Sequence, residues 1–184
     1  MKKFIGAICS GVAGILTLVM LSFDWFVRKQ TAAGELMGEA KATGWNLITN
    51  KVTVDGHTFE NAFEEFKGAY VLHRVFAIIM LVVAILLIVS AVVLLLKNLN
   101  VIKCKFNFSR VNNILLTVLA VSVLGALVGI GVMAIGAAKT VADDPFAVAM
   151  KIAVSIYPAV CAWITLAVSF VACGCGWALA RKNK

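Results

Sequence analysis

Charged residues are scarce in this sequence. Only 14% of its 184 residues are charged and nine are acidic, whereas a typical soluble domain is about a quarter charged. Hydrophobic residues make up 62% of the chain, and the mean hydropathy is +0.99. A water-soluble fold of this size cannot bury so much apolar surface in one core. The composition therefore excludes a soluble enzyme and a disordered chain, and it predicts an integral membrane protein.

Ionisable side chains are absent from the middle of the long apolar runs. Proton pumps and ion-coupled transporters commonly need such groups inside the membrane, so their absence argues against both classes. The sequence also lacks a glycine-rich phosphate loop, and its two histidines, His57 and His73, have no recognisable nucleophile or metal ligand as a partner. We therefore expect no enzymatic activity, no cofactor and no metal site.

Four apolar runs are each long enough to cross a hydrocarbon core of ~30 Å at ~1.5 Å per residue. We expect membrane spans at about 4–23, 69–96, 114–138 and 146–180. The connections between them are an outer loop at 24–68, a cytoplasmic loop at 97–113 and an outer loop at 139–145. The predicted fold class is an all-α membrane protein, in which residues 1–184 form a single four-transmembrane-helix bundle.

Basic residues predict the orientation of these spans. All nine acidic residues lie in the two loops named as outer, whereas the chain ends and the middle loop carry only Lys and Arg. Short loops rich in Lys and Arg remain in the cytoplasm, so both termini are expected inside. Because the basic excess is divided among three short segments next to the membrane, it predicts contact with anionic lipid headgroups and not with nucleic acid.

The first outer loop is expected to fold into a small cap. Residues 45–49 and 51–54 favour β-structure and are separated by Asn50, which predicts a short β-hairpin. A large aromatic side chain next to Gly44 can bury much apolar surface, so we expect Trp45 to pin this cap.

Helix extensions are expected to complete the cap. From Thr58 onward the spacing becomes helical, with an aromatic stripe formed by Phe59, Phe63 and Phe66. This stripe is interpreted as the core of the cap, with a docking site as the alternative. Asp144 followed by Pro145 predicts the start of the last helix, again outside the membrane. Pro158 is expected to kink that helix.

Small residues recur at every fourth position on two spans: Gly6, Ser10 and Gly14 on the first, Gly125 and Gly129 on the third. In lipid, such positions let helices approach closely. Contacts within one bundle are favoured, and contacts between protomers of a homo-oligomer are the alternative.

None of the five cysteines lies in an outer loop. An outer disulfide is therefore excluded, as is a quinone-linked oxidoreductase that needs outer cysteine pairs. Cys173 and Cys175 flank a glycine near the end of the last span. Packing of small residues is the favoured interpretation there, and metal binding or acylation is the alternative.

Two short motifs carry a resemblance to known proteins. Gly44-Trp45-Asn46-Leu47 lies in the large first outer loop, and Phe23-Asp24-Trp25-Phe26 precedes it. The plan resembles the claudin-like tetraspan architecture, and the motifs are similar to a pattern in small bacterial four-span membrane proteins. The paired loop cysteines of claudins are missing, so the resemblance implies a fold plan and no junction function.

These features favour a non-enzymatic integral membrane scaffold or accessory subunit. Its ordered outer loop would contact a membrane or extracellular protein partner. The alternative is an oligomeric channel or small transporter lined by the glycine faces. Since no loop disulfide and no outer glycosylation sequon are found, we expect the setting to be a bacterial cell membrane.

Overall fold

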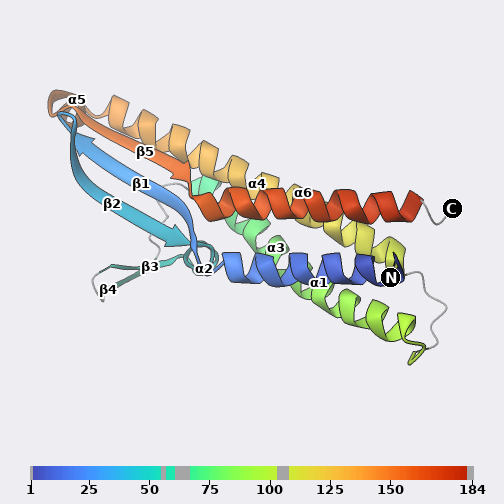
Figure 1. Ribbon diagram of the computed structural model, residues 1–184. Helices are drawn as coiled ribbons and strands as arrows, with labels where there is room; N and C mark the ends of the chain where they lie inside the picture. Colours follow the sequence, from blue (N-terminus) through green and yellow to red (C-terminus); the bar gives the residue numbers. More distant parts are fainter. Residues whose placement is uncertain (1, 55–56, 61–66, 103–107, 182–184) are drawn as a thin grey trace. The chain divides into compact units, whose positions relative to one another are not determined.

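The computed structural model describes residues 2–54, 57–60, 67–102 and 108–181 (Figure 1). The long helices of this part of the chain are α1 (Lys2–Met20), α3 (Lys67–Asn98), α4 (Phe108–Asp143) and α6 (Val160–Arg181). Its short helices are α2 (Gly44–Thr49) and α5 (Pro145–Ala149). Its strands are β1 (Asp24–Ala32), β2 (Glu35–Thr43), β3 (Lys51–Val54), β4 (His57–Glu60) and β5 (Ile152–Pro158).

Three of the described helices are long and apolar enough to cross a membrane: Gly68–Asn98 in α3, Phe108–Asp143 in α4 and Val160–Ala178 in α6. Helix α1 contains a shorter apolar stretch, Phe4–Met20. The protein is thus mostly helical with three candidate membrane spans. The all-α expectation is incomplete, because a three-stranded sheet accompanies the helices.

The apolar run at 146–180 is not one helix. Helix α5 starts as predicted, with the Asp144 side chain accepting a hydrogen bond from the Phe146 backbone N–H at 2.9 Å, but it ends after five residues. Strand β5 follows, and the helix resumes only at Val160. The predicted kink at Pro158 is therefore wrong, since Pro158 is the last residue of a strand.

Strand β5 explains why this apolar run leaves the helical conformation. It pairs antiparallel with β1, from Ala32 opposite Ile152 to Phe26 opposite Pro158. Strand β1 also pairs antiparallel with β2, so the sheet order is β2-β1-β5. The alternating Ile152, Val154 and Ile156 of β5 favour a strand once such a partner is available.

The predicted hairpin at 45–54 is wrong in its first half, because 44–49 form helix α2. The Thr43 hydroxyl accepts a hydrogen bond from the Asn46 N–H at 3.1 Å, and the Asn46 side chain accepts one from the Thr43 N–H at 3.2 Å. This reciprocal capping box starts a helix where strand propensity alone predicts a strand. Asn50, in the left-handed conformation with φ of 61°, ends the helix.

A hairpin does form from the second half of that segment, but its partner strand lies downstream. Strands β3 and β4 pair from Lys51 opposite Glu60 to Val54 opposite His57. The prediction of a helix from Thr58 is wrong, because Thr58 belongs to β4. Of the aromatic stripe, Phe59 lies in β4, whereas Phe63 and Phe66 lie outside the described residues.

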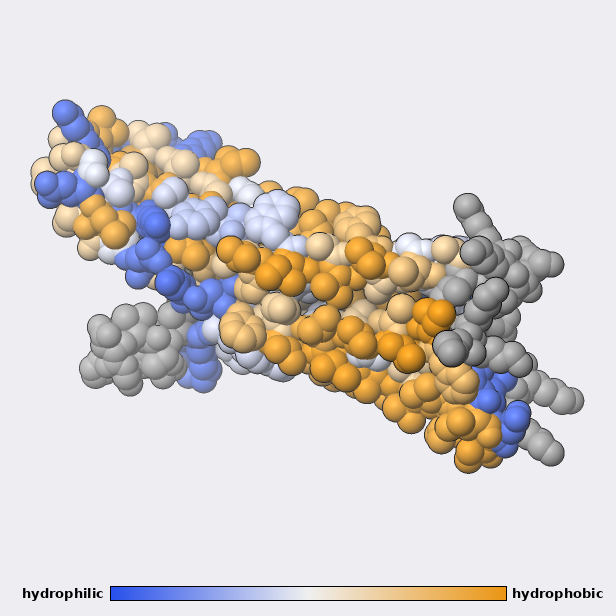
Figure 2. All heavy atoms as spheres, viewed as in Figure 1, coloured by the Kyte–Doolittle hydropathy of each residue, from blue (hydrophilic) through white to orange (hydrophobic). Residues whose placement is uncertain are grey.

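The chain divides into two compact units. Unit 1 comprises Met1–Met20, Ile78–Leu124 and Ile164–Lys184, and its described residues form segments of α1, α3, α4 and α6 and the turn after α3. Unit 2 comprises Leu21–Ala77 and Gly125–Trp163, and it contains every described strand. Hydrophobic residues cover the long helices, and hydrophilic ones gather among the strands (Figure 2).

Candidate interaction surface

The sheet of unit 2 rests on a buried aromatic contact. Trp25 of β1 is fully buried and meets the His73 ring of α3 edge-on, with centroids 6.4 Å apart. The Nδ1 atom of His73 lies 2.7 Å from the Ala126 carbonyl oxygen, and a carbonyl only accepts, so Nδ1–H is the donor. Strand β1 is thereby fixed to α3, and α3 to α4.

Contacts at the start of α6 also hold β1. The Ala159 N–H donates to the Trp25 carbonyl at 2.8 Å, and the Cys161 thiol donates to the Asp24 carbonyl. These bonds fix the end of β1 at which the chain leaves α1. The sheet is therefore held by side-chain and backbone contacts within unit 2.

Strand β2 is the exposed edge of this sheet. It pairs with β1 on one side, and no described strand pairs with its other side. Every residue from Glu35 to Lys41 is exposed, including Leu36 at 58% and Met37 at 69%. The register shifts between Gln30 and Thr31, which leaves Met37 without a direct partner as a bulge. Two large apolar side chains thus project from an open strand edge.

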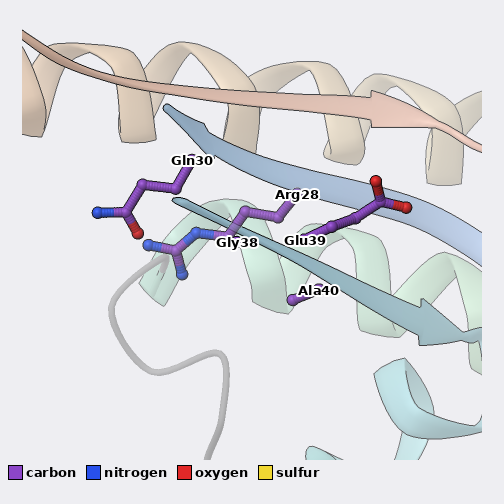
Figure 3. Close-up of a pocket in the computed structure, with 5 residues that line it drawn as sticks. All are labelled: Arg28, Gln30, Gly38, Glu39 and Ala40. Carbon is purple, nitrogen blue, oxygen red and sulfur yellow. The ribbon is translucent and has the colours of Figure 1, made fainter. Parts of the chain in front are cut away.

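A hollow of about 320 Å³ opens beside β1 and β2. Arg28 lies opposite Ala40 and Gln30 lies opposite Gly38, so two long polar side chains face two residues with little or no side chain. Figure 3 shows Arg28 and Gln30 pointing to one side of the sheet, whereas the Glu39 carboxylate points elsewhere. A guanidinium beside an amide suits a carboxylate or the polar backbone of a bound peptide.

Charged side chains of β1 and β2 lie near this hollow. The Glu39 carboxylate lies 3.2 Å from the Lys41 ammonium and 3.5 Å from that of Lys29, and the hydrogen bond from Lys41 is the main cause that lowers the pKa of Glu39. The pKa of Lys29 is raised, first by its hydrogen bond to Tyr157. These groups are exposed to solvent, so they contribute little to stability and more to recognition.

Leu47 anchors helix α2 to the rest of unit 2, and the expectation that Trp45 is buried is wrong. Leu47 is fully buried, and its carbonyl accepts a hydrogen bond from the Tyr70 hydroxyl at 2.9 Å. Trp45 is 39% exposed, and its indole N–H donates to the Ser22 hydroxyl at 3.2 Å. A Cβ on Gly44 would lie 2.5 Å from a Leu21 methyl group and 3.0 Å from the Leu21 backbone, so this glycine permits a close approach.

The small-residue positions differ in what they face. A Cβ on Gly125 would lie 2.6 Å from the Phe76 ring, and one on Gly129 would lie 2.8 Å from the His73 Cβ. In unit 1, a Cβ on Gly14 would lie 2.7 Å from the Ala84 carbonyl oxygen. Nothing lies within 4 Å of a Cβ placed on Gly6.

A buried polar cluster joins three helices of unit 1. The Ser10 hydroxyl of α1 donates to the Gly6 carbonyl at 2.7 Å and accepts a hydrogen bond from the Asn112 amide of α4. The Ser90 hydroxyl of α3 donates to the Asn112 side-chain oxygen at 3.3 Å. Asn112 was not expected as a site residue, although the pair Asn112-Asn113 at the edge of an apolar run is the signal in the sequence that marks it.

Cys173 and Cys175, near the end of α6, differ in their surroundings. Cys173 lies 3.5 Å from the Thr117 hydroxyl of α4, to which the Trp177 indole N–H also donates at 3.1 Å. Cys175 is a free, exposed cysteine. Among the described residues, no group of three or more His, Cys, Asp or Glu side chains is arranged to hold a metal ion.

Comparison of the chain with protein-family models and with curated proteins found no match.

Proposed function

We propose that this protein is a four-span, non-enzymatic scaffold or accessory subunit of a bacterial cell membrane, with both termini in the cytoplasm. Three apolar helices of sufficient length support the membrane setting. In this proposal α1 supplies the fourth span, with Phe4–Met20 as its apolar stretch. The separation of basic from acidic loops supports the orientation.

The exposed edge of β2 is the observation that supports a protein partner. Exposed strand edges in proteins are usually shortened, charged or covered, because they offer unpaired backbone groups to another chain. Here the edge strand is nine residues long and carries exposed Leu36 and Met37. A partner that adds an extended segment would obtain affinity from backbone hydrogen bonds and specificity from adjoining pockets. The hollow beside Arg28 and Gln30 is such a pocket.

A channel lined by glycines is the competing function. Gly125 and Gly129 face Phe76 and His73 of the same chain, and Gly14 faces Ala84. These three glycines pack against the same chain and are not free to line a pore, which supports the scaffold over the channel.

Stoichiometry and conductance in lipid nanodiscs separate the two functions. A protein that is a monomer and conducts nothing supports the scaffold, and a closed ring with conductance overturns it. The interaction surface is tested in native membranes by a photo-crosslinking residue at Met37, with one at Val82 of α3, which is 50% exposed, as the control. We expect one discrete adduct at Met37, lost when Leu36→Lys is added. Equal adducts at both positions would contradict the edge as a binding surface.

Impermeant labelling in intact cells tests the orientation. A cysteine introduced at Lys41 or Lys51 should react from outside, whereas Cys104 should react only after permeabilisation. Reaction of Cys104 in intact cells would overturn the proposed topology.

A further inference from the structure

The exposed edge of β2 is both open and regular over one short stretch. A bulge at Met37 interrupts its pairing with β1, and the pairing is regular from Gly38 to Ala42. Ala42 is buried, whereas every residue of 35–41 is exposed. An added strand can therefore form a ladder of backbone hydrogen bonds with residues 38–41.

The hollow lies on this same stretch. Gly38 and Ala40 of β2 line it, and Gln30 and Arg28 of β1 are their respective partners in the register. Side chains two residues apart in a strand share a face, and Figure 3 shows Arg28 and Gln30 pointing to one side of the sheet. Because Gly38 has no side chain and Ala40 has only a methyl group, the side chains of β2 on this face are too small to screen β1 from the open edge.

A strand added to β2 would lie two strand spacings from β1, which is about 9.6 Å. Residues that are paired directly across neighbouring strands point to the same face of the sheet. A residue of the added strand opposite Gly38 or Ala40 would therefore point to the side of the hollow. A long side chain there can meet the guanidinium of Arg28 above the small residues of β2.

The charges around the hollow select the side chain that fits. Glu39 also lines the hollow, but its carboxylate points elsewhere and lies 3.2 Å from the Lys41 ammonium and 3.5 Å from that of Lys29. On the side to which Arg28 and Gln30 point, the lining therefore offers a positive charge and an amide donor. A carboxylate is the complement of this pair, because a guanidinium binds it through two charge-assisted hydrogen bonds.

We propose that the partner of this scaffold contributes an extended acidic segment, which pairs with residues 38–41 and places an Asp or Glu side chain against Arg28 in the hollow. This inference rests on the proposed function and names the chemistry of the partner at the same edge. Backbone hydrogen bonds to β2 would give affinity for an extended segment, and the carboxylate would give selectivity. A segment with Lys at that position would bring two like charges together and would bind more weakly.

The probe for this test is a library of random linear peptides displayed on phage, panned on the full chain in lipid nanodiscs. We expect the wild-type protein to enrich peptides that share Asp or Glu at one fixed position. One enriched peptide is then synthesised with its acidic residue and with the corresponding amide residue, and both affinities are measured by fluorescence polarisation. The acidic form should bind at least about tenfold more tightly, because the amide form loses the charge-assisted hydrogen bonds.

Three variants locate the carboxylate. Arg28→Gln should abolish the difference in affinity between the acidic and amide peptides. Lys29→Gln is the matched control, because Lys29 carries the same charge on the next residue of β1 but points to the other face, and it should preserve the difference. Gly38→Leu should also abolish the difference, because its side chain fills the space opposite Gln30. A Cβ at Gly38 has nothing within 4 Å, so this variant should still fold.

Several results would overturn the acidic segment and leave the scaffold function standing. One is equal affinity of the two peptides for wild type, when both still block the photo-adduct at Met37. Another is a preference for the acidic peptide that Arg28→Gln leaves unchanged. Glutamate blocked at both ends that binds as tightly as the whole peptide would indicate a site for a small carboxylate, without strand pairing.

Failure to enrich any peptide would also reject the acidic segment. The proposed function is judged separately, by the adduct at Met37 in native membranes. The wild-type protein alone gives the ratio of the two affinities, so a folding defect in a variant does not protect the proposal from rejection.

Discussion

Unit 1 and unit 2 are stabilised by different kinds of contact. In unit 1, helices are joined by small residues and by a few polar side chains, such as Asn112 between Ser10 and Ser90. In unit 2, a backbone ladder joins β1 to β5, segments more than a hundred residues apart in the chain, and the sheet is anchored through Trp25. In lipid, helix association depends on close packing and on hydrogen bonds between side chains. A sheet needs partner strands before any of its hydrogen bonds exist.

The largest expected effect comes from the anchor of the sheet. Trp25→Ala removes a fully buried indole from the contact with His73, and truncation of a buried tryptophan typically costs ~3–5 kcal/mol. Limited proteolysis should then cut within β1 and β2 while the long helices stay inserted. Trp163→Ala, at a 53% exposed position, is the control and should leave the digestion pattern unchanged. Equal patterns for both variants would show that the sheet does not depend on Trp25.

The second variant tests whether close helix packing also stabilises unit 2. Gly129→Leu forces a side chain against the Cβ and backbone of His73, and overpacking of this kind costs about 1–3 kcal/mol. The melting temperature in detergent should fall, with no change in oligomer size. Gly131→Leu is the matched control, because a Cβ there has nothing within 4 Å. Dissociation of an oligomer by Gly129→Leu would move this contact from within the chain to a protomer interface.

The polar cluster of unit 1 should contribute less to the stability of the protein than Trp25 or Gly129 does. Asn112→Ala leaves Ser10 and Ser90 without their shared partner, and hydrogen bonds between membrane helices average about 0.6 kcal/mol, up to about 1.7. We expect a small fall in melting temperature and faster hydrogen exchange in α1. Ser109→Ala, at an exposed position of α4, provides the comparison. A fall as large as that of Trp25→Ala would mean that the units do not differ in the way described.

The smallest effect concerns pH and the exposed ion pairs of β2. The folded-state pKa of Glu39 is lowered by Lys41 and then Lys29, so its contribution to stability is present above the ordinary value of 4.5 and is lost as the pH falls through the folded pKa. The difference in melting temperature between wild type and Glu39→Gln should shrink over that acidic range. It should also shrink in high salt. A difference that persists at low pH would show that the carboxylate charge is not responsible.

Hydrophobicity alone predicted the helices α1, α3 and α4, because a membrane span must be long and uncharged whatever its neighbours are, but it wrongly predicted one helix over 146–180. The helix cap at Asp144 and Pro145 was equally local and is confirmed. The errors lie where local signals competed. Residues 44–49 have strand propensity, yet the capping box between Thr43 and Asn46 makes them helical. The aromatic spacing after Thr58 is helical, yet Thr58 pairs with Thr53 in a hairpin.

The sequence by itself therefore determined which stretches are long and apolar enough to cross a membrane, and how charge is distributed between them, because each depends on composition over a single stretch of chain. The tertiary structure alone decided that β1, β2 and β5 form a sheet, since 152–158 is apolar enough for a helix and becomes a strand only beside β1. It also decided that Gly129 lies against His73. Such contacts join residues from separate elements, and no local sequence pattern predicts which elements will pack together.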